Sequence, residues 1–380
     1  MPTPSSADNG TLIIQPNYMK LSITMIGLVV FVYALRAGQA VIVPILFALL
    51  LAMLLDPVVE RMVKWRIPRW IGISVSILFA MLFMAGIGYF IATQAAHFSE
   101  AMPDLEKKWN ALGKDMQRWA QGAFNMKRQE VAEAVEKVKT ESMEKGGTLV
   151  GQTLTTVGTL FAFFFLLPVF TFLILLYKHL LLGFIARLFK PERHPQVRTT
   201  LKKLRGVVGS YLMGLILEAG IVATLNWLGL MAIGVQYALL LAVISAVLNL
   251  IPYIGMMIAT ALPMLIALAT VEPSAAIWVL VLYSAVQFVD NNIIVPRIVG
   301  ARVQLNALVS LVAVMVGGAI WGVPGMFLSL PIAAMLKVIF DHSDGLQPFG
   351  YLLGDDQPKS PHGIFTSRSK AAIRPPVQPG

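Results

Sequence analysis

The chain has 380 residues, of which 57% are hydrophobic and only 13% charged, and its mean hydropathy is +0.73. Soluble domains carry about 25% charged residues, so this composition excludes an ordinary soluble protein and predicts an all-α polytopic membrane protein. The absence of cysteine excludes disulfides and thiolate chemistry, and the distribution of the net charge of +10 between loops matters more than its size.

Uncharged stretches recur along the chain at lengths suited to membrane helices, which need about 20 apolar residues. After an N-terminal cytoplasmic segment, 1–19, the first apolar run is expected to be an uncleaved anchor, because a second apolar run follows it at once. We predict about six full transmembrane helices, at 21–35, 37–55, 70–97, 149–177, 207–229 and 274–294.

Three connecting segments, 60–69, 178–205 and 297–302, are rich in Lys and Arg. The positive-inside rule places all three on the cytoplasmic side, together with both chain termini. Segment 100–148 instead balances acidic and basic residues, and the alternation of spans puts it outside, where we expect a solvated, extramembrane helical hairpin. The rest divides into the first membrane helices (20–99), one membrane helix (149–177), a transport core (206–342) and a disordered cytoplasmic tail (343–380).

Two apolar stretches of the core, 238–271 and 303–338, are interrupted by glycine and proline. Each arm is too short to cross the membrane at 1.5 Å per residue, and each stretch begins and ends on one side. We therefore predict two re-entrant helical hairpins of opposite orientation, a pattern that points to a transporter's binding site. The alternative is that Gly and Pro only kink ordinary spans. The site residues placed at these interruptions are Pro252, Tyr253, Gly255, Gly317, Gly318, Gly322, Pro324 and Gly325.

Glu218 is the most informative single residue. It follows Arg205 by 13 positions, which is roughly 20 Å along a helix and therefore deep in the membrane. A carboxyl group there is costly unless it faces protein or water, and Gly206, Ser210 and Gly214 precede it at four-residue intervals on one small-residue face. Glu218 is thus a candidate proton carrier. The alternative is a protonated side chain bonded to a neighbouring carbonyl.

A second polar stripe consists of Tyr283, Gln287, Asp290 and Asn291, which recur at helical spacing. We expect Gln287, Asp290 and Asn291 to take part in substrate binding or ion coupling. For Asp290 the alternative is an interfacial carboxylate paired with Arg297, since about 10 Å of helix separates the two residues.

Asn249 precedes the first interruption and Asn306 opens the second hairpin. Each is a candidate for binding substrate, and the alternative is that each bonds to backbone groups freed by the kinks. No zinc-binding HExxH motif, nucleophile elbow or Walker A loop is present, and the five histidines are scattered. We therefore expect no catalytic residues, no metal site and no cofactor.

Several motifs in order resemble the autoinducer-2 exporter (AI-2E) family of bacterial membrane proteins, over about 20–342. The resemblance implies secondary transport without ATP, a location in the bacterial inner membrane, and a homo-oligomer such as a pentamer. Members are associated with export of the quorum signal autoinducer-2 or with Na⁺/H⁺ antiport. The motifs include Leu248-Asn249-Leu250-Ile251-Pro252-Tyr253-Ile254-Gly255, Val295-Pro296-Arg297-Ile298-Val299-Gly300 and Trp321-Gly322-Val323-Pro324-Gly325.

Three functions remain open. The first is proton-coupled export of a small polar organic solute such as autoinducer-2, with Glu218 or Asp290 carrying protons. The second is Na⁺(Li⁺)/H⁺ antiport, in which the same two acids bind the ions in competition. The third is a non-transporting membrane scaffold that uses segments 100–148 and 178–205. Membrane lipids are expected partners of the basic loops, and nucleic acid is not.

Overall fold

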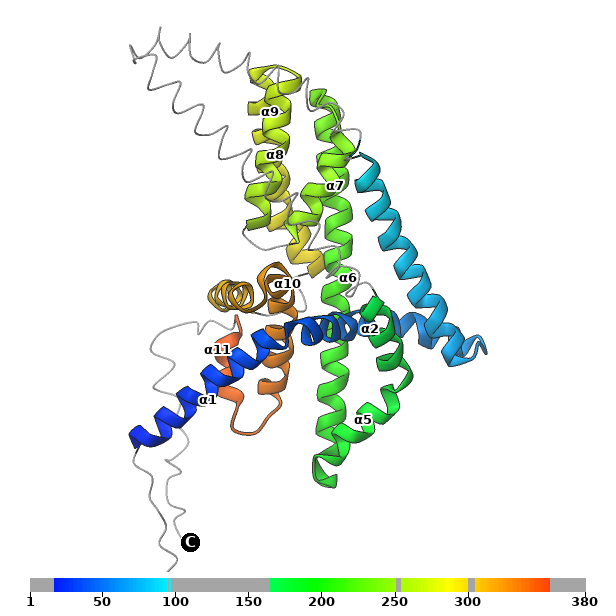
Figure 1. Ribbon diagram of the computed structural model, residues 1–380, viewed down its shortest axis with the longest axis vertical. Helices are drawn as coiled ribbons and strands as arrows, with labels where there is room; N and C mark the ends of the chain where they lie inside the picture. The colour runs from blue at the N-terminus through cyan, green and yellow to red at the C-terminus, as the bar shows by residue number, and fades with distance from the viewer. Residues whose placement is uncertain (1–16, 95, 97–164, 251–253, 300–304, 356–380) are drawn as a thin grey trace, which may run out of the picture.

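The computed structural model describes residues 17–94, 96, 165–250, 254–299 and 305–355, and the regular structure in these ranges is helical (Figure 1). This confirms the all-α polytopic membrane architecture. Five of the described helices are long and apolar enough to cross a membrane, and six if one bent pair counts as a single span. The predicted outer hairpin 100–148, most of 1–19, and the site residues Pro252 and Tyr253 lie outside the described residues.

The N-terminal helices follow one another with short breaks. Gly38 separates α1 (Asn17–Ala37) from α2 (Gln39–Lys64), and a turn leads from α2 into the helix Arg69–Gln94. The bent pair comes next, because the helix Phe165–Leu176 turns by 64° into α5 (Lys178–Arg187). The side chains of α2, Arg69–Gln94 and Phe165–Leu176 pack together around Val59, Ile73 and Leu175, each at most 2% exposed.

The longest of the described helices is α6 (His194–Ile233), which follows the 3₁₀ turn η1 (Pro191–Arg193). Its 40 residues extend about 60 Å, roughly twice the thickness of the hydrocarbon core, so it extends well past the predicted span 207–229. Lys and Arg are good helix formers, and the basic segment before Arg205 therefore continues the helix. The helix ends at Gly234, whose φ of 84° permits the left-handed cap that closes it.

The first predicted hairpin is two antiparallel helices, α7 (Ala238–Asn249) and α8 (Ile254–Thr270), followed by α9 (Pro273–Val289) and the π-helix η2 (Asp290–Val299). The helices α7, α9 and η2 pack on the C-terminal half of α6, and α8 packs on α7 and α9 (Figure 1). A β-carbon at Gly255 would overlap the carbonyl group of Leu248, so glycine is what lets the two arms approach at their connection.

The second predicted hairpin is α10 (Ala307–Asp341), which is broken at Gly322 (φ 63°, ψ −143°). That backbone conformation is accessible essentially only to glycine, and it reverses the chain. Both helix–break–helix units therefore occur where the glycines and prolines predict them, whereas their re-entry into the membrane stays a prediction. α10 packs against α2 and α6 through Val208, Tyr211 and Leu328.

The expected disordered tail begins with ordered structure instead. Residues 347–353 form α11 (Gln347–Leu353), which packs against α10 with a Phe340–Phe349 ring contact of 6.0 Å between centroids. The helix is stabilised by aromatic packing and by hydrogen bonds to Asn306, neither of which composition reveals. The remainder of the predicted tail, from residue 356, lies outside the described residues.

Candidate functional site

Acidic and amide side chains are buried along one face of α6. Glu218 is 7% exposed and Asn226 2% exposed, with Val222 between them on the same face. The predicted small-residue stripe fits only in part, because Gly206 is exposed and a β-carbon there would meet nothing within 4 Å. The interior position of Glu218 itself agrees with the prediction that it faces protein rather than lipid.

Asp290 occupies the junction at which α9 changes into the π-helix η2. The residue is 2% exposed, and its Oδ2 accepts a hydrogen bond of 3.4 Å from Nδ2 of Asn249, the last residue of α7. Its Oδ1 is buried and has no hydrogen-bond partner. A buried, half-satisfied carboxylate is costly, and π-turns within helices are frequently found at functional sites.

Glu218 and Asp290 belong to one cluster. Their charges are close enough to interact electrostatically, and η2 packs directly on α6. Val222 packs with Val286 and Ile294, which lie one turn before and one turn after Asp290. Asn226 adds a second buried oxygen without a partner, its Oδ1, two turns along α6 from Glu218. The predicted pairing of Asp290 with Arg297 is not among the ion pairs of the described residues.

The predicted polar stripe of α9 divides into two faces. Tyr283 is buried and shares a 2.9 Å hydrogen bond with Ser245, which also donates to the carbonyl group of Ala259. Gln287 and Asn291 instead bond to one another at 3.1 Å on a more exposed face. The structure thus brings Asn249 and Asp290 together and leaves Gln287 and Asn291 beside, rather than within, the buried cluster.

The remaining predicted residues lie in the second hairpin. Asn306 caps α10 through a 2.8 Å bond from the amide of Val309, and its Nδ2 donates to the carbonyl groups of Leu352 (2.7 Å) and Gly354 (3.0 Å). This corresponds to the backbone-bonding alternative for Asn306. The other members of this set shape the bend: Gly317, Gly318, Gly322, Pro324 and Gly325.

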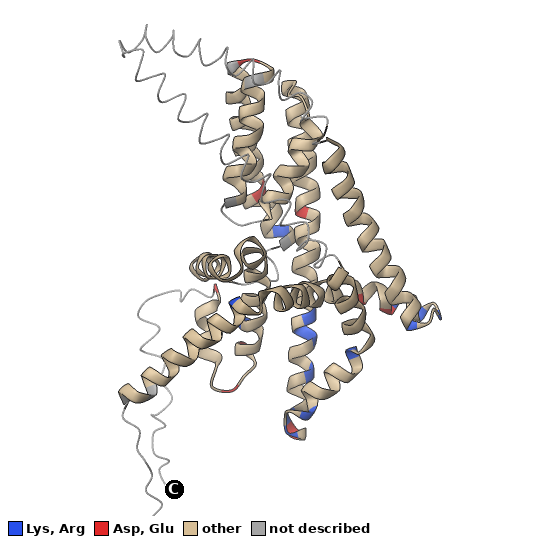
Figure 2. Cartoon of the chain, in the orientation of Figure 1, with Lys and Arg blue, Asp and Glu red and all other residues tan. Residues whose placement is uncertain are grey.

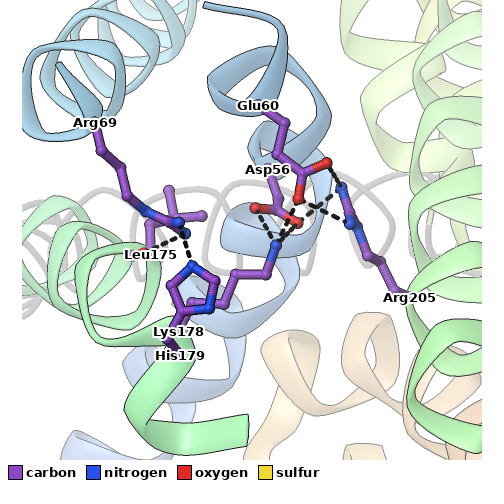
Figure 3. Close-up of polar contacts among 7 residues, drawn as sticks. All are labelled: Asp56, Glu60, Arg69, Leu175, Lys178, His179 and Arg205. Atoms are coloured by element: carbon purple, nitrogen blue, oxygen red, sulfur yellow. Dashed lines mark hydrogen bonds and ion pairs between the residues drawn. The ribbon is translucent and has the colours of Figure 1, made fainter. Parts of the chain in front are cut away.

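A cluster of four charged residues, which sequence reasoning missed, joins α2 to the start of α5 and to α6 (Figure 3). Asp56 is 3% exposed and receives Lys178 Nζ at 2.7 Å and Arg205 Nη2 at 2.8 Å. Glu60 also contacts Lys178 at 2.8 Å and Arg205 at 3.2 Å. The two cations thus neutralise the two acids and link α2, α5 and α6. We call this set of residues the ion-pair cluster: Asp56, Glu60, Lys178 and Arg205.

The sequence holds a signal for this cluster. Asp56 and Glu60 lie one turn apart, on one face, at the end of the uncharged run 37–55. Two acids there need cations, and Lys and Arg are concentrated on α5 and the N-terminal half of α6 (Figure 2). Among the described residues, His, Asp and Glu form no group of three that would hold a metal ion.

Comparison with known proteins supplies the family. The sequence model described as AI-2E family transporter matches residues 22–345, most of the chain. The AI-2 transport protein TqsA of Escherichia coli (strain K12) is 25% identical over 347 residues, covering 90% of this chain and 98% of TqsA. YhhT of the same strain is 25% identical over 342 residues, covering 90% of this chain and 96% of YhhT. YueF of Bacillus subtilis (strain 168) is 25% identical over 310 residues, covering 78% of this chain and 82% of YueF. The chain therefore belongs to the AI-2E transporter family and is a multi-pass membrane protein with a role in transport.

Proposed function

We propose that this chain is a proton-coupled secondary transporter that exports a small polar organic solute such as autoinducer-2. The observation that carries the proposal is the buried pair of acids, Glu218 on α6 and Asp290 at the start of η2. An ionisable residue inside a membrane protein is costly, faces the protein interior, and marks a proton or substrate pathway.

The geometry around Asp290 suits a group that changes its bonding. One carboxylate oxygen is held by Asn249 and the other has no partner, so a proton or a polar substrate group has a place to bind. Asn249 ends α7 next to the connection of the first hairpin. Movement of the hairpin therefore alters the bonding of Asp290 directly, and this links the binding of a solute to the binding of a proton.

Similarity to TqsA supports the choice of solute. The name of that relative specifies AI-2 transport, and the match covers 98% of its length. Uncharged amide groups such as those of Asn249 and Asn226 suit a small polar solute, because they donate and accept hydrogen bonds without requiring a charged ligand. Export rather than uptake is our inference from the family resemblance.

The test is gradient-driven release of autoinducer-2 from proteoliposomes, with a pH-sensitive dye reporting proton movement. Wild type is compared with Glu218→Gln and Asp290→Asn, which keep the shape of each side chain but remove its titration. The matched control is Glu272→Gln, because Glu272 is an exposed acid that precedes α9. We expect wild type and the control to couple proton movement to release, and both variants of the buried acids to lose the coupling.

Three outcomes overturn the proposal. Equal coupling in wild type and in both buried-acid variants, with all proteins monodisperse, would exclude Glu218 and Asp290 as the coupling groups. Proton flux evoked by Na⁺ or Li⁺ in the absence of organic solute would replace solute export with antiport. A protein that moves neither solute nor ions, although folded, would favour the scaffold.

A further inference from the structure

The turn that joins α2 to the helix Arg69–Gln94 has an unusual backbone. Arg66 has φ 65°, in the left-handed region, where its amide bonds to Val63 O (3.0 Å) and the amide of Ile67 bonds to Met62 O (3.2 Å). This is the closing motif of a helix, in which the left-handed position is usually glycine. A side chain there costs about 1 kcal/mol or more relative to glycine, so Arg66 places its guanidinium group on the turn at some cost to the backbone.

Three cations of this turn point outward without an acid. Arg61, Lys64 and Arg66 are exposed, and none forms an ion pair with a carboxylate among the described residues. The nearest acid in sequence, Glu60, is already bound by Lys178 and Arg205. The ion-pair cluster therefore neutralises the cations behind the turn, and the charge on the turn remains available to an external anion.

Two exposed tryptophans accompany these cations, Trp65 between Lys64 and Arg66 and Trp70 four residues after Arg66. Trp65 is 69% exposed and Trp70 59% exposed. Tryptophan is enriched where a membrane protein crosses the headgroup region, because the indole ring is largely apolar but its N–H group prefers a polar partner. The turn thus combines the two residue types that bind lipid headgroups, and it directly follows the apolar part of α2.

A small apolar groove lies between the helices that lead away from the turn. It lies between α2, Arg69–Gln94 and Phe165–Leu176, and it is lined by Leu51, Ile77, Ala80, Met81, Met84, Leu167 and Pro168. Ile77, Met81 and Met84 share a helical face with Trp70, and Ile77 is about 10 Å from it along the axis. Met84 is about 21 Å from Trp70, so the groove extends from the leaflet beside the turn to near the middle of the 30 Å hydrocarbon core.

We propose that this turn and groove form a binding site for an anionic glycerophospholipid. Arg61, Lys64 and Arg66 bind the phosphate, Trp65 and Trp70 lie at the level of the glycerol, and an acyl chain lies along the groove. The site is separate from the transport cluster at Glu218 and does not depend on the transported species. Orientation of the chain in the membrane requires only positive charge on the turn, and it explains neither the left-handed Arg66 nor the groove.

The critical variant is Arg66→Gly, because glycine relieves the backbone while removing the charge. In detergent, we expect phosphatidylglycerol to raise the thermal unfolding midpoint of wild type more than phosphatidylcholine does. Arg66→Gly is expected to unfold at the same or a higher temperature without lipid, yet to lose most of the increment from phosphatidylglycerol. Native mass spectrometry of the same samples counts the retained lipid. The matched control is Arg198→Gln with Lys202→Gln, which removes two exposed cations from α6.

A second variant tests the groove. Met81→Trp places a bulky ring over it, and we expect long-chain phosphatidylglycerol to bind less tightly while the protein remains folded. An undiminished phosphatidylglycerol increment in Arg66→Gly, or its loss in the α6 control instead, would overturn the headgroup site. Unchanged lipid retention in Met81→Trp would overturn the assignment of the acyl chain to the groove.

Discussion

Gly317 and Gly325 face each other across the bend of α10, and a β-carbon on either residue would overlap the carbonyl group of the other. Gly255 meets the carbonyl group of Leu248 in the same way beside the connection between α7 and α8. Both hairpins therefore depend on direct contact between backbones, which small residues alone permit. Steric fit is therefore central to both bends, and in the first hairpin Ser245 of α7 adds a hydrogen bond to the carbonyl group of Ala259 on α8.

Alanine at the bend of α10 is expected to destabilise the protein. Gly325→Ala should lower the free energy of unfolding by about 1–3 kcal/mol, because the arms must separate to admit a methyl group. The control is Gly220→Ala on α6, where a β-carbon meets nothing within 4 Å, and alanine there should be neutral or stabilising. The measurement is the unfolding midpoint in detergent. Equal midpoints for the two variants would show that the arms do not touch.

Breaking the ion-pair cluster should be more costly than breaking a surface pair. Asp56→Asn leaves two partly buried cations with Glu60 alone, and we expect a loss of roughly 3 kcal/mol in unfolding by denaturing detergent. Asp344→Asn removes the exposed Arg193–Asp344 pair and should cost less than about 1 kcal/mol. Adding Arg205→Gln to Asp56→Asn should cost less than the sum of the two single changes. Strict additivity would mean that the cluster is not a coupled unit.

Asn306 offers a way to separate two structural tasks. Asn306→Asp keeps the oxygen that caps α10 but removes both donors to the end of α11. We expect faster hydrogen exchange of the amides of 347–353 and unchanged exchange in the first turn of α10, with a stability loss of about 1–2 kcal/mol. Asn306→Ala should accelerate both. The control, Asn292→Ala, removes an exposed amide that bonds only within its own helix. Solute transport that fails in Asn306→Asp while α11 stays protected would instead assign Asn306 to binding.

Trp321 ties the first helix to the second hairpin. Its Nε1 donates to the carbonyl group of Leu35 at 2.9 Å, whereas most of the side chains of α1 are exposed. Trp321→Phe is expected to broaden the distance distribution between spin labels at Tyr33→Cys and Val323→Cys. The chain has no cysteine of its own, so the labels attach only at the chosen sites. An unchanged distribution would mean that packing alone holds α1.

The sequence predicts the elements well because each uncharged run reflects a physical requirement of the membrane. The positions of the broken helices follow from glycine and proline, and the burial of Glu218 follows from its depth. The predicted small-residue stripe agrees less well with the structure. A four-residue repeat does not match the 3.6 residues per turn of an α-helix, so each interval turns the next residue slightly around the axis. After three such intervals Gly206 no longer lies on the face of Glu218. Gln287 lies beside the buried cluster, whereas Asp290 lies within it. The helix changes to a π-helix at Asp290, and local periodicity in the sequence does not reveal this change.

The periodicity of the sequence does not predict which distant segments contact one another. Asp56 and Lys178 are 122 positions apart, and Asn249 and Asp290 are 41 apart. Each pair forms because helices pack with a particular rotation, and that rotation depends on the shapes of all the apolar side chains between them. The basic loops therefore predicted an orientation, whereas the structure assigns two of their cations to the ion-pair cluster.

The unbroken length of α6 has a mechanical consequence. After Pro195 in its first turn the helix contains no proline, and the ion-pair cluster contacts it at Arg205, whereas the first hairpin contacts its other half. A continuous helix of this kind transmits rotation from one half to the other. If Arg205 separates from Asp56 and the basic half of α6 rotates about the helix axis, the Glu218 side chain rotates with it. The carboxyl group of Glu218 then moves relative to Asp290.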